Sequence, residues 1–245
     1  MHSNSWSPSA AVSRVRSSGR FACSLHTGTT TETILSRAML SLYRFPALYG
    51  LAMRIAYRQD YGARHALIAD MIGRSTNVLE LCCGDLALYR HLASRGLVRA
   101  YVGLEQSPAM LRLGTRRGVE VRPFDVRAST ELPPAETVIM QASLYQFHDV
   151  AETLLPRLWA AARRLLVIAE PVRNLAQSRN ALARWLAREL TRTADGRVHA
   201  FRYTEAALLD LYDRCRIPVS RLERTRRGHE LVVGSLRGPS PGPRP

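Results

Sequence analysis

The chain has 245 residues, of which 46% are apolar and 22% charged, so it is long enough to bury a full core as one large domain. Its four cysteines show no CxxC spacing, which argues against a metal site or a disulfide framework and favours a reducing compartment, here the cytoplasm. No run of 18 apolar residues occurs, so we expect no membrane-spanning helix.

The formal net charge is +15, and every basic residue is an arginine. Residues 76–150 carry eight arginines and eight acids, whereas residues 151–245 carry eighteen arginines and nine acids. A basic rim around a neutral centre attracts an anionic substrate or a nucleic acid. Scattered arginines are also the ordinary surface of a folded protein, so we favour a small-molecule partner over RNA.

The two ends of the chain differ in composition from the rest. Residues 1–31 are rich in Ser and Thr and contain no acid, which predicts a disordered extension. Residues 238–245 read GPSPGPRP, which predicts a flexible tail. A single domain is therefore expected over residues 32–237.

Within that domain, segments of helical periodicity alternate with apolar runs of strand length. Thr204 precedes a helical segment as its expected cap, and Arg227-Gly228 forms the expected tight turn of a hairpin. In chain order we predict helix Thr33–Arg44, helix Ala63–Ile72, strand Asn77–Leu81, helix Ala87–Ser94, strand Ala100–Leu104, helix Pro108–Thr115 capped by Ser107, strand Val119–Arg122, strand Thr137–Gln141, helix Val150–Arg164, strand Leu165–Ala169, helix Asn180–Thr191, helix Glu205–Cys215, strand Val219–Thr225 and strand Glu230–Leu236.

This alternation predicts an α/β fold, with a doubly wound, Rossmann-like and mostly parallel sheet of seven strands. Because the last two strands form a hairpin, the final strand should run antiparallel to the others. The segment 172–202 is long for a connection, and its amphipathic helix predicts a helical lid over a substrate pocket.

In such a sheet the ligand binds beyond the carboxyl end of the first strand, where this chain reads ELCCGDL over residues 80–86. A dinucleotide site would have three glycines there, but only Gly84 is present and Cys82 stands in the first glycine position. Asp85 would place a carboxylate where a phosphate needs donors. A nicotinamide or nucleoside triphosphate cofactor is therefore disfavoured.

The same segment suits a positively charged nucleoside. Glu80 and Asp85 bracket the turn, and Glu105 follows 25 residues after Glu80, at the end of the second strand. An acid at that place accepts hydrogen bonds from ribose hydroxyls. A cationic adenosine compound, S-adenosylmethionine (SAM), satisfies both features.

These segments resemble the class I SAM-dependent methyltransferases, over about residues 43–171 and more loosely to residue 236. The resemblance lies in five segments that follow one another in the order of the family. They are VLELCCGD at 78–85, VGLEQSPAML at 102–111, FDV at 124–126, LYQFHD at 144–149 and IAEPVRN at 168–174.

The resemblance implies cofactor contacts for eight residues, and Cys82 fits the first glycine position as a small residue. Asp85, which brackets the turn with Glu80, is expected at the cofactor because of its charge. The implied contacts are Glu80 near the methionine ammonium, Gly84 for close backbone approach, Glu105 on the ribose, Gln106 beside the adenine, Asp125 on the adenine amino group, Val126 as a backbone donor, and Gln141 with Ala142 against the methionine portion.

Methyl transfer from a sulfonium is an in-line displacement, so the protein chiefly aligns the acceptor and excludes water. If the acceptor carries a proton, His148 is the candidate base and Tyr145 the candidate orienting group. The alternative is that Tyr145 packs on the next helix, His148 is solvated and Asp149 caps that helix. Glu170 is either a carboxylate supporting the site or the end of a core strand.

The sequence therefore favours a SAM-dependent methyltransferase that acts on oxygen or nitrogen of a small polar or anionic metabolite. A catalytically idle SAM-binding regulatory module is an alternative, because two of the three expected glycines are absent. RNA methylation is a second alternative, because both flanks of the chain are basic. The sequence leaves the acceptor and the oligomeric state open.

Overall fold

The computed structural model describes residues 46–129, 131–172 and 201–238. The predicted extension 1–31, the predicted helices at 33–44 and 180–191, nearly all of the predicted lid and all but the first residue of the predicted tail lie outside these ranges. No helix in the described ranges combines the length and apolar character needed to cross a membrane.

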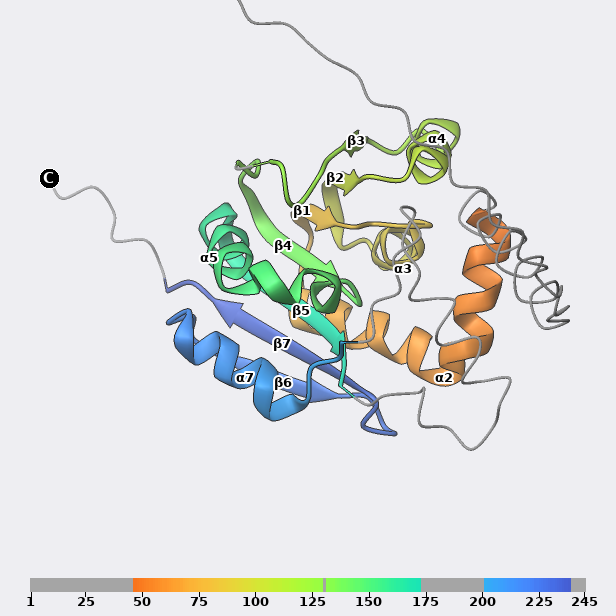
Figure 1. The fold of residues 1–245 in the computed structure, drawn as a ribbon. Helices are drawn as coiled ribbons and strands as arrows, with labels where there is room; N and C mark the ends of the chain where they lie inside the picture. The colour runs from red at the N-terminus through yellow and green to blue at the C-terminus, as the bar shows by residue number, and fades with distance from the viewer. Residues whose placement is uncertain (1–45, 130, 173–200, 239–245) are drawn as a thin grey trace, which may run out of the picture.

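Seven strands form one sheet, as predicted, in the order β3-β2-β1-β4-β5-β7-β6 (Figure 1). The pairs β3/β2, β2/β1, β1/β4 and β4/β5 are parallel, whereas β7 runs antiparallel to both β5 and β6. The strands are β1 (Thr76–Leu81), β2 (Val98–Glu105), β3 (Val121–Pro123), β4 (Ala135–Gln141), β5 (Ala162–Pro171), β6 (Arg221–Arg224) and β7 (Glu230–Leu236).

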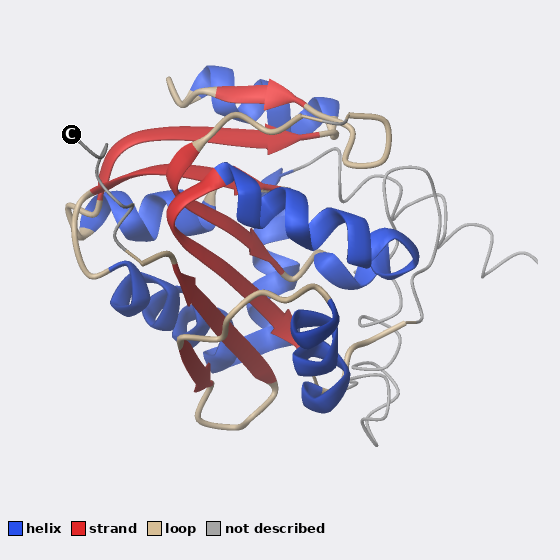
Figure 2. Ribbon diagram, turned by 90° about the vertical axis from the view of Figure 1, so that its left-hand side faces the viewer, coloured by secondary structure: helices blue, strands red, loops and turns tan. Residues whose placement is uncertain are grey.

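Helices cover both faces of the twisted sheet (Figure 2). Alternate residues of β4 show why, because Val138 and Met140 pack on the side of α5 and α7, whereas Ile139 packs on the side of α2 and α3. The helices are α2 (Pro46–Ile72), α3 (Ala87–Ser94), α4 (Pro108–Arg116), the 3-10 helix η1 (Leu144–Val150), α5 (Ala151–Ala161) and α7 (Glu205–Arg214).

Most helix and strand boundaries fall within a few residues of the prediction. Two helix boundaries and one additional helix differ from it, each for a local reason. Helix α2 begins at Pro46 rather than Ala63, because Gly50 and Gly62 weaken the helical signal of its first half. Helix α5 ends at Ala161, since β5 follows at once without a loop. The segment before α5 forms the helix η1, which the sequence pattern did not predict.

The two predicted helix caps have different outcomes. The Thr204 side chain accepts a hydrogen bond from the Ala207 amide at 3.1 Å, which confirms it as the cap of α7. Ser107 stands at the cap position of α4, but its side chain accepts no bond from the helix. The carboxylate of Glu105 instead accepts bonds from the Gln106 and Ser107 amides.

Candidate active site

A cavity lies at the carboxyl ends of the parallel strands, beside the neighbouring strands β1 and β4. From β1 the chain continues to β2 on one side of this point, and from β4 it continues to β5 on the other side. Its walls come from the loop after β1, the ends of β2 and β4, the helix η1 and the helix α2. The lining residues are Met53, Tyr61, Arg64, Cys82, Cys83, Gly84, Asp85, Leu104, Glu105, Gln106, Ser107, Met110, Phe124, Val126, Gln141, Ala142, Ser143, Tyr145, Gln146 and Phe147.

The loop after β1 adopts backbone conformations that usually require glycine, although only one of the three residues concerned is a glycine. Cys82, Gly84 and Leu86 have φ angles of 54°, 54° and 61°, so every second residue is left-handed. This conformation costs a residue other than glycine roughly 1–2 kcal/mol. The Leu86 side chain is fully buried in the core beneath α2 and α3, which offsets that cost. Strain of this kind is retained at functional sites.

Cys83 sets a second constraint on the loop. A Cβ atom built on Gly103 of β2 would lie 2.7 Å from the Cys83 Sγ atom. The bare backbone of Gly103 therefore makes room for the buried thiol, and the two vicinal cysteines act as small packing residues. Burial raises the pKa of both thiols above the ordinary range, which disfavours a reactive thiolate.

Asp85 occupies the start of α3, as the sequence predicted. Its Oδ1 atom accepts a hydrogen bond from the Ala87 amide at 3.1 Å and lies 3.4 Å from the Tyr61 hydroxyl. Its Oδ2 atom lies 3.8 Å from the Arg90 guanidinium. The amide that could bind a phosphate at this helix end is therefore already paired with a carboxylate.

Glu105 ties the tip of β2 to the loop after β1. Its carboxylate accepts hydrogen bonds from the amides of Gly84, Gln106 and Ser107, each at 2.9 Å. Burial raises the pKa of Glu105, and these three amides oppose that rise. A carboxylate accepts about four hydrogen bonds, so Glu105 retains capacity for one hydroxyl without losing a partner.

Glu80 is fully buried and is not among the residues that line the cavity. Its carboxylate accepts bonds from the Tyr101 hydroxyl at 2.7 Å and from the Gln141 Nε2 atom at 2.8 Å. Burial raises the pKa of Glu80 to about 7. Because Gln141 donates through its nitrogen, its carbonyl oxygen is the acceptor that remains, and this buried atom has no partner among the described residues.

Gln106, Phe124 and Val126 also line the cavity. Asp125 lies just behind them. Its Oδ2 atom is 3.5 Å from the Gln106 Nε2 atom, and its Oδ1 atom accepts the Arg127 amide at 2.8 Å. Asp125 therefore closes the turn after β3 and touches the cavity through Gln106.

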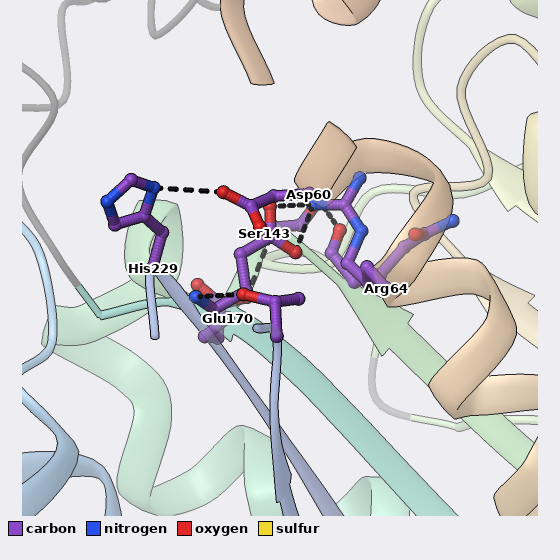
Figure 3. Close-up of polar contacts among 8 residues, drawn as sticks. Asp60, Arg64, Ser143, Glu170 and His229 are labelled. Atoms are coloured by element: carbon purple, nitrogen blue, oxygen red, sulfur yellow. Dashed lines mark hydrogen bonds and ion pairs between the residues drawn. The ribbon is translucent and has the colours of Figure 1, made fainter. Parts of the chain in front are cut away.

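Glu170, at the end of β5, has a clear structural role. Its buried carboxylate accepts the amides of Ser143 at 2.8 Å and Leu144 at 2.7 Å, which holds the first turn of η1 (Figure 3). Burial raises the pKa of Glu170 to about 7. The carboxylate thereby fixes the segment that carries Tyr145 and His148.

Tyr145 lines the cavity, with the Arg202 guanidinium 3.8 Å from its ring centre. His148 is exposed and does not line the cavity. Its ring stacks on Phe201 with centroids 4.2 Å apart, and its Nδ1 atom lies 3.2 Å from the Tyr145 carbonyl oxygen. Asp149 is not a helix cap, because it pairs with Arg127 at 2.7 Å instead and the cap position belongs to Val150.

A buried polar cluster that α2 brings to the cavity was not predicted from the sequence. Arg64 binds both carboxylate oxygens of Glu230 at 2.9 and 3.1 Å, and both side chains are almost fully buried. The His229 ring lies 2.9 Å from the Asp60 carboxylate (Figure 3). An arginine among the apolar residues of the predicted helix at 63–72 was the available signal, but its partner is 166 residues away.

The structure brings most of the predicted site residues together. Glu80 and Asp125 each lie one contact behind the cavity, and His148 reaches it only through the Tyr145 backbone. The predicted residues that line it are Cys82, Gly84, Asp85, Glu105, Gln106, Val126, Gln141, Ala142 and Tyr145.

Several solved structures of other proteins have a fold similar to that of this chain. No family model matches the chain, and no curated protein matches it. DhpI in complex with SAH is 22% identical, with 86% of this chain and 98% of DhpI covered and a TM-score of 0.60. A SAM-dependent methyltransferase from Mesorhizobium loti is 15% identical, with 71% and 98% covered and a TM-score of 0.54.

The 1,6-didemethyltoxoflavin-N1-methyltransferase from Burkholderia thailandensis, with bound S-adenosylhomocysteine, is 18% identical over 89% of this chain and 94% of its own, with a TM-score of 0.53. These likenesses, together with the strand order, show that the chain has the fold of the class I SAM-dependent methyltransferases. The fold expected from the five sequence segments is confirmed.

Proposed function

We propose that this protein transfers a methyl group from SAM to an oxygen or nitrogen atom of a small polar or anionic metabolite. The charge of the cleft carries the proposal. Asp85 and Glu105 line it, whereas Arg64, which also lines it, is paired with the buried Glu230. The cleft therefore favours a positively charged ligand over a phosphate.

The described residues suit the parts of SAM. Glu105 has capacity for a ribose hydroxyl, and Gln141, which lines the cavity and bonds the buried Glu80 carboxylate, would lie against the methionine portion. Gln106 and Val126, which also line the cavity, would contact the adenine. The bound SAH of DhpI and of the Burkholderia enzyme agrees with this assignment.

SAM supplies the activated methyl group, so the chain has to orient the acceptor and exclude water, and it has to take a proton where the acceptor carries one. A backbone carbonyl only accepts hydrogen bonds, so the contact with Tyr145 places the His148 proton on Nδ1. The Nε2 atom of His148 then carries the lone pair that a general base needs. Tyr145, buried beneath Arg202, would orient the acceptor.

One observation favours a second candidate, an idle SAM-binding regulatory module. Cys82 and Leu86 have left-handed backbone conformations that suit glycine. The loop therefore has the backbone shape of a SAM-binding loop, but side chains stand where that loop would have glycines. Such a protein would bind SAM and transfer nothing.

Calorimetric titration with SAM and with S-adenosylhomocysteine tests the cofactor, and incubation of the protein and SAM with a metabolite extract tests turnover by release of S-adenosylhomocysteine. The enzyme proposal expects both binding and turnover. Binding without turnover favours the regulatory module, and absence of binding rejects both. RNA affinity that falls steeply with salt would instead favour RNA methylation.

His148→Ala tests the proposed base. We expect slower turnover with an unchanged dissociation constant for SAM, because His148 does not line the cleft. Phe201→Leu is the matched control, since it removes the stacked ring but keeps the imidazole. Normal turnover in His148→Ala would exclude His148 as the base.

A further inference from the structure

A second cavity lies on the other side of Asp85, among α2, α3 and α4, with a volume of about 250 Å³. We call it the arginine cavity. Three arginines line it, Arg54 of α2, Arg90 of α3 and Arg117 at the C-terminal cap of α4, and Asp85 separates it from the cleft described above. The lining residues are Gly50, Leu51, Arg54, Asp85, Arg90, Leu113 and Arg117.

Positive charge exceeds negative charge in this cavity. Three guanidiniums face a single carboxylate, that of Asp85, which already bonds the Ala87 amide. Arg90 and Arg117 both donate to the Asp85 carbonyl oxygen, at 3.0 and 3.3 Å. Within the described ranges, no carboxylate forms an ion pair with Arg54 or Arg117.

The positive charges of Arg90 and Arg117 also repel each other. Partial burial and the neighbouring charge of Arg90 lower the pKa of Arg117. An anion placed among these side chains would relieve that repulsion and gain charge-assisted hydrogen bonds. The cavity is thus built for a negative ligand, unlike the cleft on the other side of Asp85.

We propose that the arginine cavity binds the phosphate group of a small phosphorylated molecule. A phosphate presents three terminal oxygens in three directions and carries up to two charges, so it can bond guanidiniums that approach from three segments, whereas a carboxylate has two coplanar oxygens and one charge. Leu51 and Leu113 provide an apolar wall for the rest of the ligand. This site goes beyond methyl transfer and does not depend on it.

The test is calorimetric titration of the full chain, at constant ionic strength, with inorganic phosphate, phenyl phosphate and benzoate. We expect saturable binding of both phosphates, tighter for phenyl phosphate because its ring contacts the leucines, and no saturable binding of benzoate. The double variant Arg54→Gln/Arg117→Gln should weaken phenyl phosphate at least tenfold.

The double variant Arg112→Gln/Arg116→Gln is the matched control. It removes the same charge from exposed positions of α4 outside the cavity, so it should bind phenyl phosphate like the unaltered protein. Equal weakening in both double variants, benzoate binding as tight as phenyl phosphate, or no saturable phosphate binding would each overturn the proposal. A short RNA that binds more tightly than phenyl phosphate and weakens equally in both variants would overturn it as well.

Discussion

The cleft and the arginine cavity share one residue and have opposite charge. On the cleft side, Asp85 stands with Glu105, and Arg64, the one arginine among the described residues that line it, is held by Glu230. On the other side, three arginines surround the backbone and carboxylate of the same Asp85. A net charge of +15 therefore says little about any one site, because pairing decides which charges a ligand meets.

The largest expected effect distinguishes the buried, ion-paired Arg64 from the exposed Arg117. Arg64→Met should lower the free energy of unfolding by about 3–5 kcal/mol, because it leaves Glu230 buried without its partner. Arg117→Gln should change it by less than about 0.5 kcal/mol, since surface substitutions rarely cost more. Urea denaturation measures both, and similar losses in the two variants would contradict the contrast.

The loop between the two regions offers the next test. Leu86→Gly should destabilise the protein by about 2 kcal/mol, because truncating a buried leucine costs more than relief of the left-handed backbone returns. Cys82→Gly removes a smaller, half-buried side chain, so its effect should stay within about 1 kcal/mol. Thermal and urea unfolding would show the order, and a stabilised Leu86→Gly would refute it.

Glu105→Ala tests the cleft itself. We expect SAM to bind at least tenfold more weakly, since the proposed ribose acceptor and the partner of three backbone amides are lost together. Glu120→Ala is a suitable control, because Glu120 is exposed and pairs only with Arg122 among the described residues. Calorimetry compares the two variants, and an unchanged affinity in Glu105→Ala would remove Glu105 from the cofactor site.

The last expected effect is a pH dependence of the stability. Burial raises the pKa of Glu80 from 4.5 to about 7, so between these values the folded state binds a proton that the unfolded state has released. The contribution of Glu80 to the free energy of unfolding therefore falls as pH rises through this window. Glu170 acts in the same direction, whereas His65, with its pKa lowered to about 3, acts oppositely below pH 6.5.

The variant Glu80→Gln isolates that contribution, because it keeps the side-chain shape without the titration. Urea denaturation from pH 5 to pH 8 should show the stability of the unaltered protein falling more, or rising less, than that of the variant. Parallel curves would show that Glu80 titrates near its ordinary value in the folded protein.

The sequence predicted features that depend on neighbouring residues. The apolar runs predicted all seven strands, and the predicted bounds of α3 agree with the structure. Asp85 lies at the start of that helix, as expected. Glu105 also reaches the predicted loop, because parallel strands end at one edge of the sheet. These features follow from local pattern and topology.

Contacts between distant segments were not predictable in the same way. The Arg64–Glu230 pair joins α2 to β7, and the arginine cavity joins three helices whose exposed arginines look alike in the sequence. The helix η1 depends on Glu170, which lies more than twenty residues downstream. The local sequence can mark one member of such a contact, as Arg64 shows, but it does not identify the distant partner.

The close approach of Gly103 to Cys83 has a consequence for the evolution of the loop. A side chain at position 103 and a sulfur at position 83 compete for one space. Divergence from this chain should therefore pass through a smaller residue at 83 before position 103 departs from glycine, so the two sites are expected to change in a fixed order among its descendants.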